Sequence, residues 1–209
     1  MMKPPKPCVF IVDDDPSMRE ALSSLLRSAG RSVQTFESAS SFLEYRRPDC
    51  PCCLILDMRM PGMSGPELQQ HLLAMSDLIP IIFISAHGDI PSAVRAVKAG
   101  ALEFLPKPFQ EQALLDAVAQ GLAMDAQRRS SDEFHMGLQA RFERLTAREH
   151  EVMNFAVKGM LNKQIGALLG IAEVTVKVHR HNIMQKIEAK SLPDLIQLIS
   201  DSKIYRSVK

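Results

Sequence analysis

Short apolar runs alternate with amphipathic segments along the first 124 residues of the chain. Five runs have the length of buried strands: CVFIV, SVQTF, CLIL, IIFIS and LEFL, at residues 8–12, 32–36, 53–56, 81–85 and 102–105. Between and after them, Leu, Ala and Val recur every three or four residues, which predicts helices at 17–30, 38–47, 66–75, 91–100 and 109–124. The alternation predicts an α/β fold with a five-stranded, mostly parallel sheet that helices cover on both faces.

The strand pattern stops after Met124. Residues 125–142 are polar, with sparse apolar positions, and we expect a linker there that is either irregular or a helical continuation of the preceding segment. From Leu145 onwards the pattern is entirely helical. We expect four helices: one from the capping box Thr146–Glu149 to Gly159, one capped by Asn162 and ending near Gly170, one from about Glu173 to Ile187, and one capped by Ser191. The second half therefore predicts a small all-α domain.

Composition limits the classes of protein that fit. Hydrophobic residues make up 46% of the chain, which is enough for packed cores, yet no apolar run reaches the roughly 20 residues that span a bilayer. The basic N-terminal stretch lacks the apolar segment of a signal peptide, so we expect a soluble, cytoplasmic protein without a membrane partner. Cys50, Cys52 and Cys53 lack the paired spacing of a zinc site, and we expect reduced thiols.

Charge is unevenly divided although the net charge is only +1. Residues 1–124 carry 11 Lys and Arg against 14 Asp and Glu, whereas residues 125–209 carry 14 against 10. This asymmetry favours a nucleic-acid partner for the C-terminal part, although a solvated charged face would give the same count.

Acidic residues gather where buried strands end. Asp13, Asp14 and Asp15 follow the first strand, and Asp57 follows the third. Asp15 is explained as a helix cap, but the others would repel one another at the edge where parallel strands end. A Mg²⁺ ion, which prefers oxygen ligands, would relieve that repulsion. Asp57 could then act as a nucleophile toward a phosphoryl group, and Ser85 and Lys107, at the ends of strands four and five, could stabilise the transferring oxygens.

The stretches IVDDD, LDMRMPGMSG, ISAHGD and AGALEFLPKPF, in this order, resemble a bacterial two-component receiver domain over residues 6–124. The resemblance implies a flavodoxin-like fold in which a sensor histidine kinase phosphorylates Asp57. It implies that Asp14, Asp57 and the Arg59 backbone carbonyl bind Mg²⁺, with Asp13 assisting through water. It also implies a phosphoryl-sensing pair, Ser85 and Lys107, a switch aromatic, Phe104, and a cis Lys107–Pro108 peptide bond.

Residues 143–203 resemble a LuxR-type helix-turn-helix domain of the kind found in FixJ-like regulators, on the stretch from LTAREHEV to NIMQKI. In its third helix, one stripe is expected to face inward: Val176, His179, Ile183 and Ile187. His179 is expected to be a satisfied core histidine. Lys177, Val178 and His181 then face outward together, suited to a guanine edge and a thymine methyl in the major groove. Four further residues are candidate phosphate contacts: Thr175, Asn162, Lys163 and Arg180. Ala172, at the start of the same helix, offers no side-chain cap.

These features predict a phosphorylation-controlled transcription factor, which catalyses only its own phosphorylation and dephosphorylation. Its expected partners are a sensor histidine kinase, promoter DNA, RNA polymerase and, on phosphorylation, a second copy of itself. Two alternatives remain. One is a phosphatase resembling the haloacid dehalogenase family, but that family needs an aspartate where this chain has Arg59. The other is a receiver that ignores phosphorylation and serves only as a dimerisation scaffold.

Overall fold

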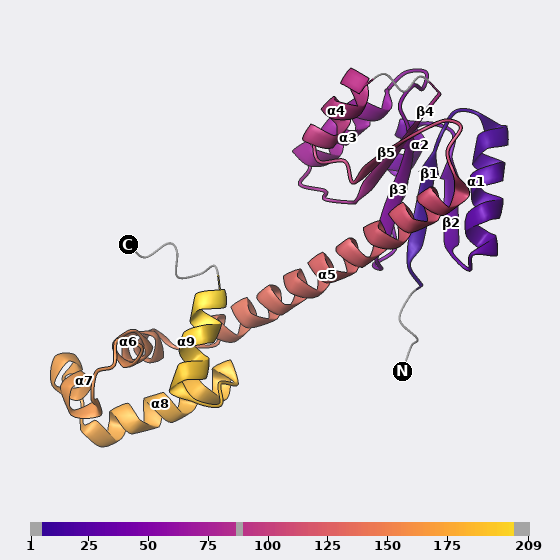
Figure 1. Ribbon diagram of the computed structural model, residues 1–209. Coiled ribbons are helices and arrows are strands. Elements are labelled where there is room, and N and C mark those ends of the chain that lie inside the picture. The colour runs from indigo at the N-terminus through magenta and orange to yellow at the C-terminus, as the bar shows by residue number, and fades with distance from the viewer. Residues whose placement is uncertain (1–5, 87–89, 203–209) are drawn as a thin grey trace. The chain divides into compact units, whose positions relative to one another are not determined.

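The computed structural model describes residues 6–86 and 90–202 of the chain. Contacts divide the chain into two compact units, Met1–Arg129 (unit 1) and Ser130–Lys209 (unit 2), which are described separately below (Figure 1). Residues 87–89 of the ISAHGD stretch, and the end of the expected second domain at residue 203, lie outside the described residues. In the part that the structure describes, no helix combines the length and apolarity needed to cross a membrane.

Unit 1 contains a parallel sheet with strand order β2-β1-β3-β4-β5, which confirms the predicted class. The strands are β1 (Cys8–Val12), β2 (Ser32–Phe36), β3 (Cys52–Asp57), β4 (Ile81–Ser85) and β5 (Glu103–Pro106). Three of them have the predicted bounds. β3 is one residue longer at each end than expected, and β5 begins and ends one residue later. Asp57 is therefore the last residue of a strand, and its backbone position is fixed by the sheet.

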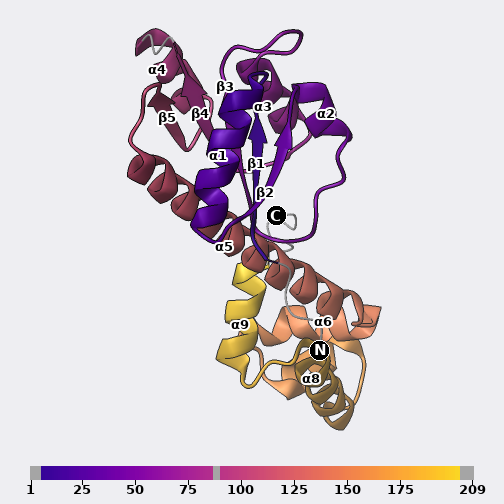
Figure 2. The same ribbon diagram turned by 90° about the vertical axis from the view of Figure 1, so that its right-hand side faces the viewer.

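Helices cover both faces of this sheet, as Figures 1 and 2 show. They are α1 (Pro16–Ser28), α2 (Ala39–Glu44), α3 (Gly65–Ala74), α4 (Ile90–Lys98) and the first part of α5 (Glu111–Glu143). Alternate residues of β1 point into different layers. Phe10 and Val12 pack with residues of α2, α3 and α4, whereas Val9 and Ile11 pack with residues of α1 and α5. Because both faces are covered, the central strands β1, β3 and β4 are buried along their whole length, whereas the edge strands β2 and β5 expose polar residues such as Gln34 and Glu103.

The predicted start and stop signals of α1 are confirmed. The Asp15 carboxylate accepts a hydrogen bond of 2.9 Å from the Ser17 backbone amide, as an N-cap does. Gly30, just beyond the helix, has φ +75°, a conformation that glycine adopts without steric cost. The cap therefore accounts for one of the three consecutive aspartates and leaves Asp13 and Asp14 for another role.

Residues 125–142, the expected linker, are helical and belong to α5. The Asp125 side chain is buried, and its Oδ2 accepts the backbone N–H of Cys52, the first residue of β3, at 2.8 Å. Arg129 donates to Asp125 at 2.9 Å and is also paired with Asp49. The chain up to Arg129 is thus bonded to the base of the sheet, beyond the expected domain end at residue 124.

Unit 2 contains the end of α5 together with α6 (Ala147–Ala156), α7 (Asn162–Leu169), α8 (Glu173–Ile187) and α9 (Leu192–Asp201). The capping box of Thr146 and Glu149 and the cap by Ser191 are confirmed. Two expectations are wrong. α6 ends at Ala156, before Gly159. Asn162 is the first residue of α7 rather than its cap, since its Oδ1 accepts a hydrogen bond of 3.1 Å from Arg180 instead.

An ion pair between the buried Glu149 and the half-buried Lys186 joins α6 to α8 in unit 2. Glu149 is buried, and its Oε2 lies 2.6 Å from the Lys186 ammonium and 2.8 Å from the Thr146 amide that it caps. Burial acts to raise the pKa of Glu149, but the ammonium and the Thr146 donors outweigh it, so the pKa lies below its usual value. Glu149 is therefore charged at neutral pH and links the start of α6 to the helix expected to read DNA.

The core of unit 2 begins before residue 143. Leu138 and Phe142, both on α5, are buried with Val152, Ile165 and Ile183. The polar appearance of residues 125–142 concealed these two apolar positions. The expected start of the second domain at residue 143 therefore leaves out two side chains that pack in its core.

This packing predicts that fragment 143–209 is less stable than fragment 130–209. Each missing side chain forfeits about 1.5–3 kcal/mol of burial free energy, before any loss of helix in the truncated segment. Urea unfolding of the two fragments, followed by circular dichroism, measures the difference. Fragment 130–209 carrying Gln139→Ala, a change at an exposed position of the same segment, is the control and should unfold like its parent. Equal stability of the two fragments would contradict the assignment of Leu138 and Phe142 to this core.

Candidate functional site

Two carboxylates from different strands converge on one cation at the carboxyl edge of the sheet. The Lys107 ammonium lies 3.1 Å from Asp13 Oδ2 and 2.8 Å from Asp57 Oδ1. Asp13 is only 1% exposed and Asp57 is also buried. Because β1 and β3 are neighbours in the sheet, their ends bring these aspartates together, and Lys107 follows β5. The structure thus gathers three of the side chains that the sequence singled out.

Burial and charge oppose each other in this cluster. Burial raises the pKa of Asp13, and the nearby Asp57 adds to the rise, while the Asp15 amide and Lys107 act against it. For Lys107, burial acts to lower the pKa, but hydrogen bonds to Asp57 and Asp13 outweigh it and raise the pKa. Lys107 is therefore a firmly charged counterion, and the Asp13 carboxylate is held in a location that disfavours its charge.

Asp14 does not join the cluster. Its side chain is exposed, and among the residues that the structure describes no three acidic, histidine or cysteine side chains lie close enough together to hold a metal ion. Arg59 is exposed as well, and its backbone amide donates to Asp57 Oδ2 at 2.7 Å. The structure therefore brings together Asp13 and Asp57, but not the complete acidic set expected from the sequence.

The carboxyl end of β3 packs closely against Gly65, a residue that the sequence did not single out. A β-carbon on Gly65, the first residue of α3, would lie 2.3 Å from the Asp57 carbonyl oxygen and 2.9 Å from the Phe83 ring. Only glycine allows α3 to begin this close to the strand end. Arg19 was also missed. Its guanidinium donates to the Asp13 carbonyl oxygen at 2.8 Å and fixes the other strand end. The LDMRMPGMSG stretch includes Gly65, but nothing in its spacing marks that glycine as a packing requirement.

Ser85 and Lys107 lie at neighbouring strand ends. Ser85 is buried at the end of β4, and its carbonyl oxygen accepts the Lys107 backbone amide at 2.8 Å. The Lys107–Pro108 peptide bond is cis, as the resemblance implied. Phe104 on β5 is partly buried against the core layer that contains Phe83, its partner on β4. The backbone therefore connects the expected sensing pair directly.

In unit 2, α8 buries one stripe and exposes another, as predicted. Val176, Ile183 and Ile187 are buried, whereas Lys177, Val178 and His181 are exposed. The expectation that His179 is satisfied is wrong, because this half-buried imidazole has a buried Nδ1 without a hydrogen-bond partner.

The expected phosphate contacts differ in how freely they could reach DNA. Lys163 is exposed, Thr175 is partly buried, and Arg180 and Asn162 are bonded to each other. The start of α8 at Ala172 has no side-chain cap bond, as predicted. These residues lie on α7 and on the first half of α8, and Lys163 is the one whose side chain is most open to solvent.

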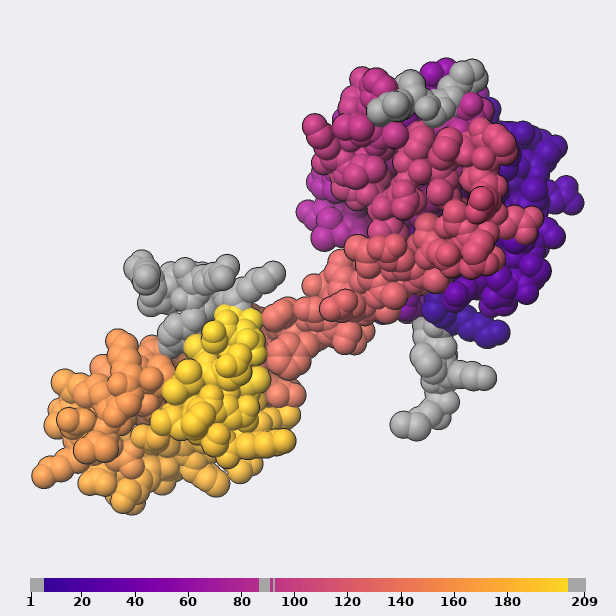
Figure 3. All heavy atoms as spheres, in the orientation of Figure 1, coloured from indigo at the N-terminus to yellow at the C-terminus, as the bar shows by residue number. Residues whose placement is uncertain are grey.

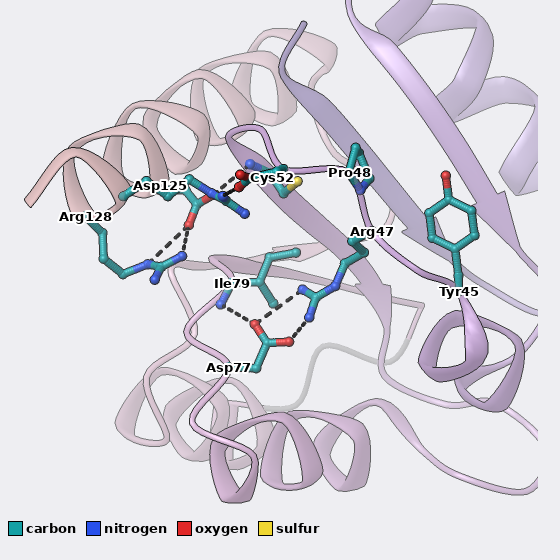
Figure 4. Close-up of a pocket in the computed structure, with 10 residues that line it drawn as sticks. Tyr45, Arg47, Pro48, Cys52, Asp77, Ile79, Asp125 and Arg128 are labelled. Atoms are coloured by element: carbon teal, nitrogen blue, oxygen red, sulfur yellow. Dashed lines mark hydrogen bonds and ion pairs between the residues drawn. The ribbon is translucent and has the colours of Figure 1, made fainter. Parts of the chain in front are cut away.

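A charged cavity of about 370 Å³ lies at the other end of β3, shown in Figure 4. Arg47 pairs with Asp77 on one side, and Arg128 and Arg129 pair with Asp125 on the other. Cys52 lines it, and Cys50, Cys52 and Cys53 are all buried free thiols. Burial, above all, raises the pKa of Cys52 and Cys53 to about 12, so both are protonated at neutral pH. Ion pairs therefore line the cavity on both sides, and the protonated, buried cysteines contribute to packing.

Comparison with family models matches both units. Residues 9–119 match the response regulator receiver domain, and residues 143–199 match the bacterial regulatory proteins of the luxR family. Both matches agree with the resemblances found in the sequence. They favour a receiver over the phosphatase alternative.

Similar proteins share this arrangement over nearly their whole length. The chain is 48% identical to nodulation protein W of Bradyrhizobium diazoefficiens over 92% of this chain and 85% of that protein. It is 50% identical to the response regulator protein TodT of Pseudomonas putida, over 91% and 84%. The solved structure of the response regulator StyR has a TM-score of 0.88 and 62% identity, covering 94% of this chain and 99% of that one.

The raised pKa of Asp13 predicts that Asp13→Asn stabilises unit 1 at pH 7. An acid whose pKa is raised by folding makes its stabilising contribution below its unfolded pKa, about 3.9, and loses it as the pH rises through the folded pKa. The neutral amide removes that loss and can still accept the Asp15 amide. Asp13→Asn should therefore be more stable than the wild type at pH 7, and the difference should disappear in acid.

Calorimetric unfolding of the full chain from pH 3 to 7 measures this effect. Asp14→Asn, at an exposed neighbouring carboxylate, is the control and should differ little from the wild type at any pH. A less stable Asp13→Asn at pH 7 would show that the ion pair with Lys107 outweighs the cost of burial.

Proposed function

The chain belongs to the bacterial response regulators that join a receiver domain to a LuxR-family DNA-binding domain, and we propose that Asp57 is the residue whose phosphorylation controls it. The family makes a sensor kinase and DNA its partners. One observation carries the proposal. Asp57 lies at the end of a buried strand, and the Lys107 ammonium is 2.8 Å from its Oδ1. A carboxylate nucleophile and a cation are therefore adjacent at the same site.

In this reaction an Asp57 oxygen attacks the phosphorus atom held by the donor. The bond between phosphorus and the donor's histidine nitrogen breaks, and an acyl phosphate forms on Asp57. Lys107 offsets the negative charge on the transferring oxygens, and Ser85 offers a hydroxyl at the neighbouring strand end. The Arg59 amide, bonded to Oδ2, holds the carboxylate in one orientation.

Mg²⁺ is the cofactor that we propose for this step, since it prefers carboxylate oxygens and phosphate. When bound, it neutralises charge on the carboxylates and on the phosphoryl group. The fit is supported by Asp13 Oδ2 and Asp57 Oδ1, which already converge on a cation, the Lys107 ammonium. Asp14 and the Arg59 carbonyl are the further candidate ligands. Mg²⁺ usually keeps several waters, so two protein carboxylates are a sufficient anchor.

The acyl phosphate on Asp57 carries about −1.5 to −2 charge where the carboxylate carried −1, in a cluster that contains one lysine. We propose that Ser85 and Lys107 are drawn toward the phosphoryl group and that Phe104, now partly buried, packs further inward. The face formed by α4, β5 and α5 would repack; Figure 3 shows these elements on the visible face of unit 1. A changed face is suited to pairing with a second copy of the chain, which would place two α8 helices on symmetric half-sites.

For unit 2 we propose that Lys177, Val178 and His181 contact bases, because all three are exposed on one side of α8. Lys163, Arg180, Asn162 and Thr175 are the proposed phosphate contacts, which position the domain on DNA. RNA polymerase is the proposed partner at the promoter, and the cytoplasm the proposed location. The proposed receiver domain covers residues 6–124, followed by a helical linker and a DNA-binding domain over 143–203, with Leu138 and Phe142 completing its core.

Asp57→Asn should abolish phosphorylation, because the amide cannot act as the nucleophile. The full chain is incubated with Mg²⁺ and a small acyl-phosphate donor, and intact-mass spectrometry follows the gain of one phosphoryl group. Asp116→Asn, at an exposed carboxylate on α5, is the control and should be labelled like the wild type. Persistent labelling of Asp57→Asn would move the acceptor to another residue.

Lys177→Ala should weaken binding to a preferred operator by about 1–3 kcal/mol more than binding to random DNA, because a base contact discriminates between sequences. Titrations of both DNAs at one salt concentration measure the two losses. Lys190→Ala removes an exposed lysine that lies outside α8 and should cost little sequence preference. An equal loss on both DNAs would identify Lys177 as a phosphate contact.

A further inference from the structure

The exposed side of α8 begins one turn earlier than the three residues proposed above. Val174, in the first turn of α8, is 66% exposed, and Val178, one turn later, is 53% exposed. Residues three, four and seven positions apart share one side of a helix. Val174 therefore lies on the same side as Lys177, Val178 and His181, at the N-terminal end of that surface.

Neither packing nor helix propensity explains this valine. Its side chain contributes little to the core of unit 2, and β-branched residues are weaker helix formers than alanine. A single exposed apolar residue needs no explanation, but two valines one turn apart, with a lysine between them, form a mixed surface. The Lys177 ammonium is paired with Glu173 at 3.4 Å, and both side chains are exposed, so the lysine can exchange this partner for another.

We propose that Val174 is a specificity-determining residue that contacts a thymine methyl group in the major groove. The inference deepens the proposed function and depends on DNA recognition by α8. Charge complementarity identifies the occupant, since the apolar pair is accompanied by Lys177 and by Lys163 on α7, within the positively charged C-terminal part of the chain. In helix-turn-helix proteins, the N-terminal residues of the recognition helix are those that reach base edges.

The spacing of the two valines defines the expected DNA pattern. Four residues of helix rise about 6 Å, and successive bases on one DNA strand rise about 3.4 Å. A helix lying along the groove would therefore place Val174 and Val178 against methyl groups about two base steps apart. Each half-site should therefore contain two thymines whose C5 methyl groups contribute to affinity. The two thymines lie either on the same DNA strand or on opposite strands.

Replacement of thymine by uracil tests this directly, because uracil lacks only the C5 methyl group. The full chain, treated with Mg²⁺ and a small acyl-phosphate donor, first selects its preferred operator from random-sequence DNA. Each thymine is then replaced in turn by uracil, and dissociation constants are measured for the wild type, Val174→Ala and Val178→Ala. For the wild type we expect about a fourfold loss at each contacted methyl, the equivalent of one buried methylene.

Val174→Ala should become insensitive to uracil at one position and keep its sensitivity at the other, while Val178→Ala should show the reverse. Leu168→Ala is the matched control, because Leu168 is 61% exposed but lies on α7, and it should keep the wild-type response at every thymine. Wild-type sensitivity of Val174→Ala at all positions would overturn the inference while leaving the proposed function intact. Failure to select any operator would overturn both.

Discussion

The repulsion between the Asp13 and Asp57 carboxylates is the constraint on which the rest of unit 1 depends. The parallel sheet brings these two groups to one edge, where the Lys107 ammonium, reaching from the end of β5, pairs with both. Three strand ends must therefore keep their relative positions for the cluster to be tolerated. A group added at Asp57 would change the charge at the point where those strand ends meet, so its effect would be transmitted to β4 and β5 through the backbone bond between Ser85 and Lys107. We therefore propose that the cluster in which Asp13 is buried is also the point from which the fold responds to phosphorylation.

Much of the fold followed from elementary patterning, because apolar runs of strand length separated by amphipathic segments leave few arrangements that bury both. Helix ends, the start of the second core and close backbone packing were harder to predict. Asn162 is a residue type that often caps helices, yet its side-chain oxygen accepts a hydrogen bond from Arg180, which lies 18 residues later in the sequence, on α8. Leu138 and Phe142 lie among polar residues, and only tertiary packing shows that they belong to a core. Gly65 is required by the approach of α3 to the Asp57 carbonyl, a constraint in space that leaves no periodic mark in the sequence.

The two units differ in how they handle charge. In unit 1 the buried carboxylates of the described residues lie at the two ends of β3: Asp13 and Asp57, paired with Lys107, at one end, and Asp125 at the other. In unit 2 the buried Glu149 and the half-buried Lys186 form an ion pair that links α6 to α8, while Lys177 and Glu173 on α8 are exposed. A rigid internal contact that holds an exposed reading surface is suited to recognition of a fixed shape. A compensated internal cluster is suited to a change of state. The placement of these charges agrees with the proposed roles, a change of state in unit 1 and DNA recognition in unit 2.

The hydrogen bond between Asp125 and the Cys52 amide has a consequence for exchanging modules between such regulators. A chimera that kept only residues 6–124 would remove Asp125, the acceptor of a buried amide at the base of β3, together with Arg129, the partner of Asp49. A graft that started the other module at residue 143 would remove Leu138 and Phe142 from its interior. The stretch 130–137, exposed except for His135, separates these two sets of contacts. A crossover that preserves both interiors must therefore fall within those eight positions of one continuous helix, where the helical phase as well as the sequence would pass from one parent to the other.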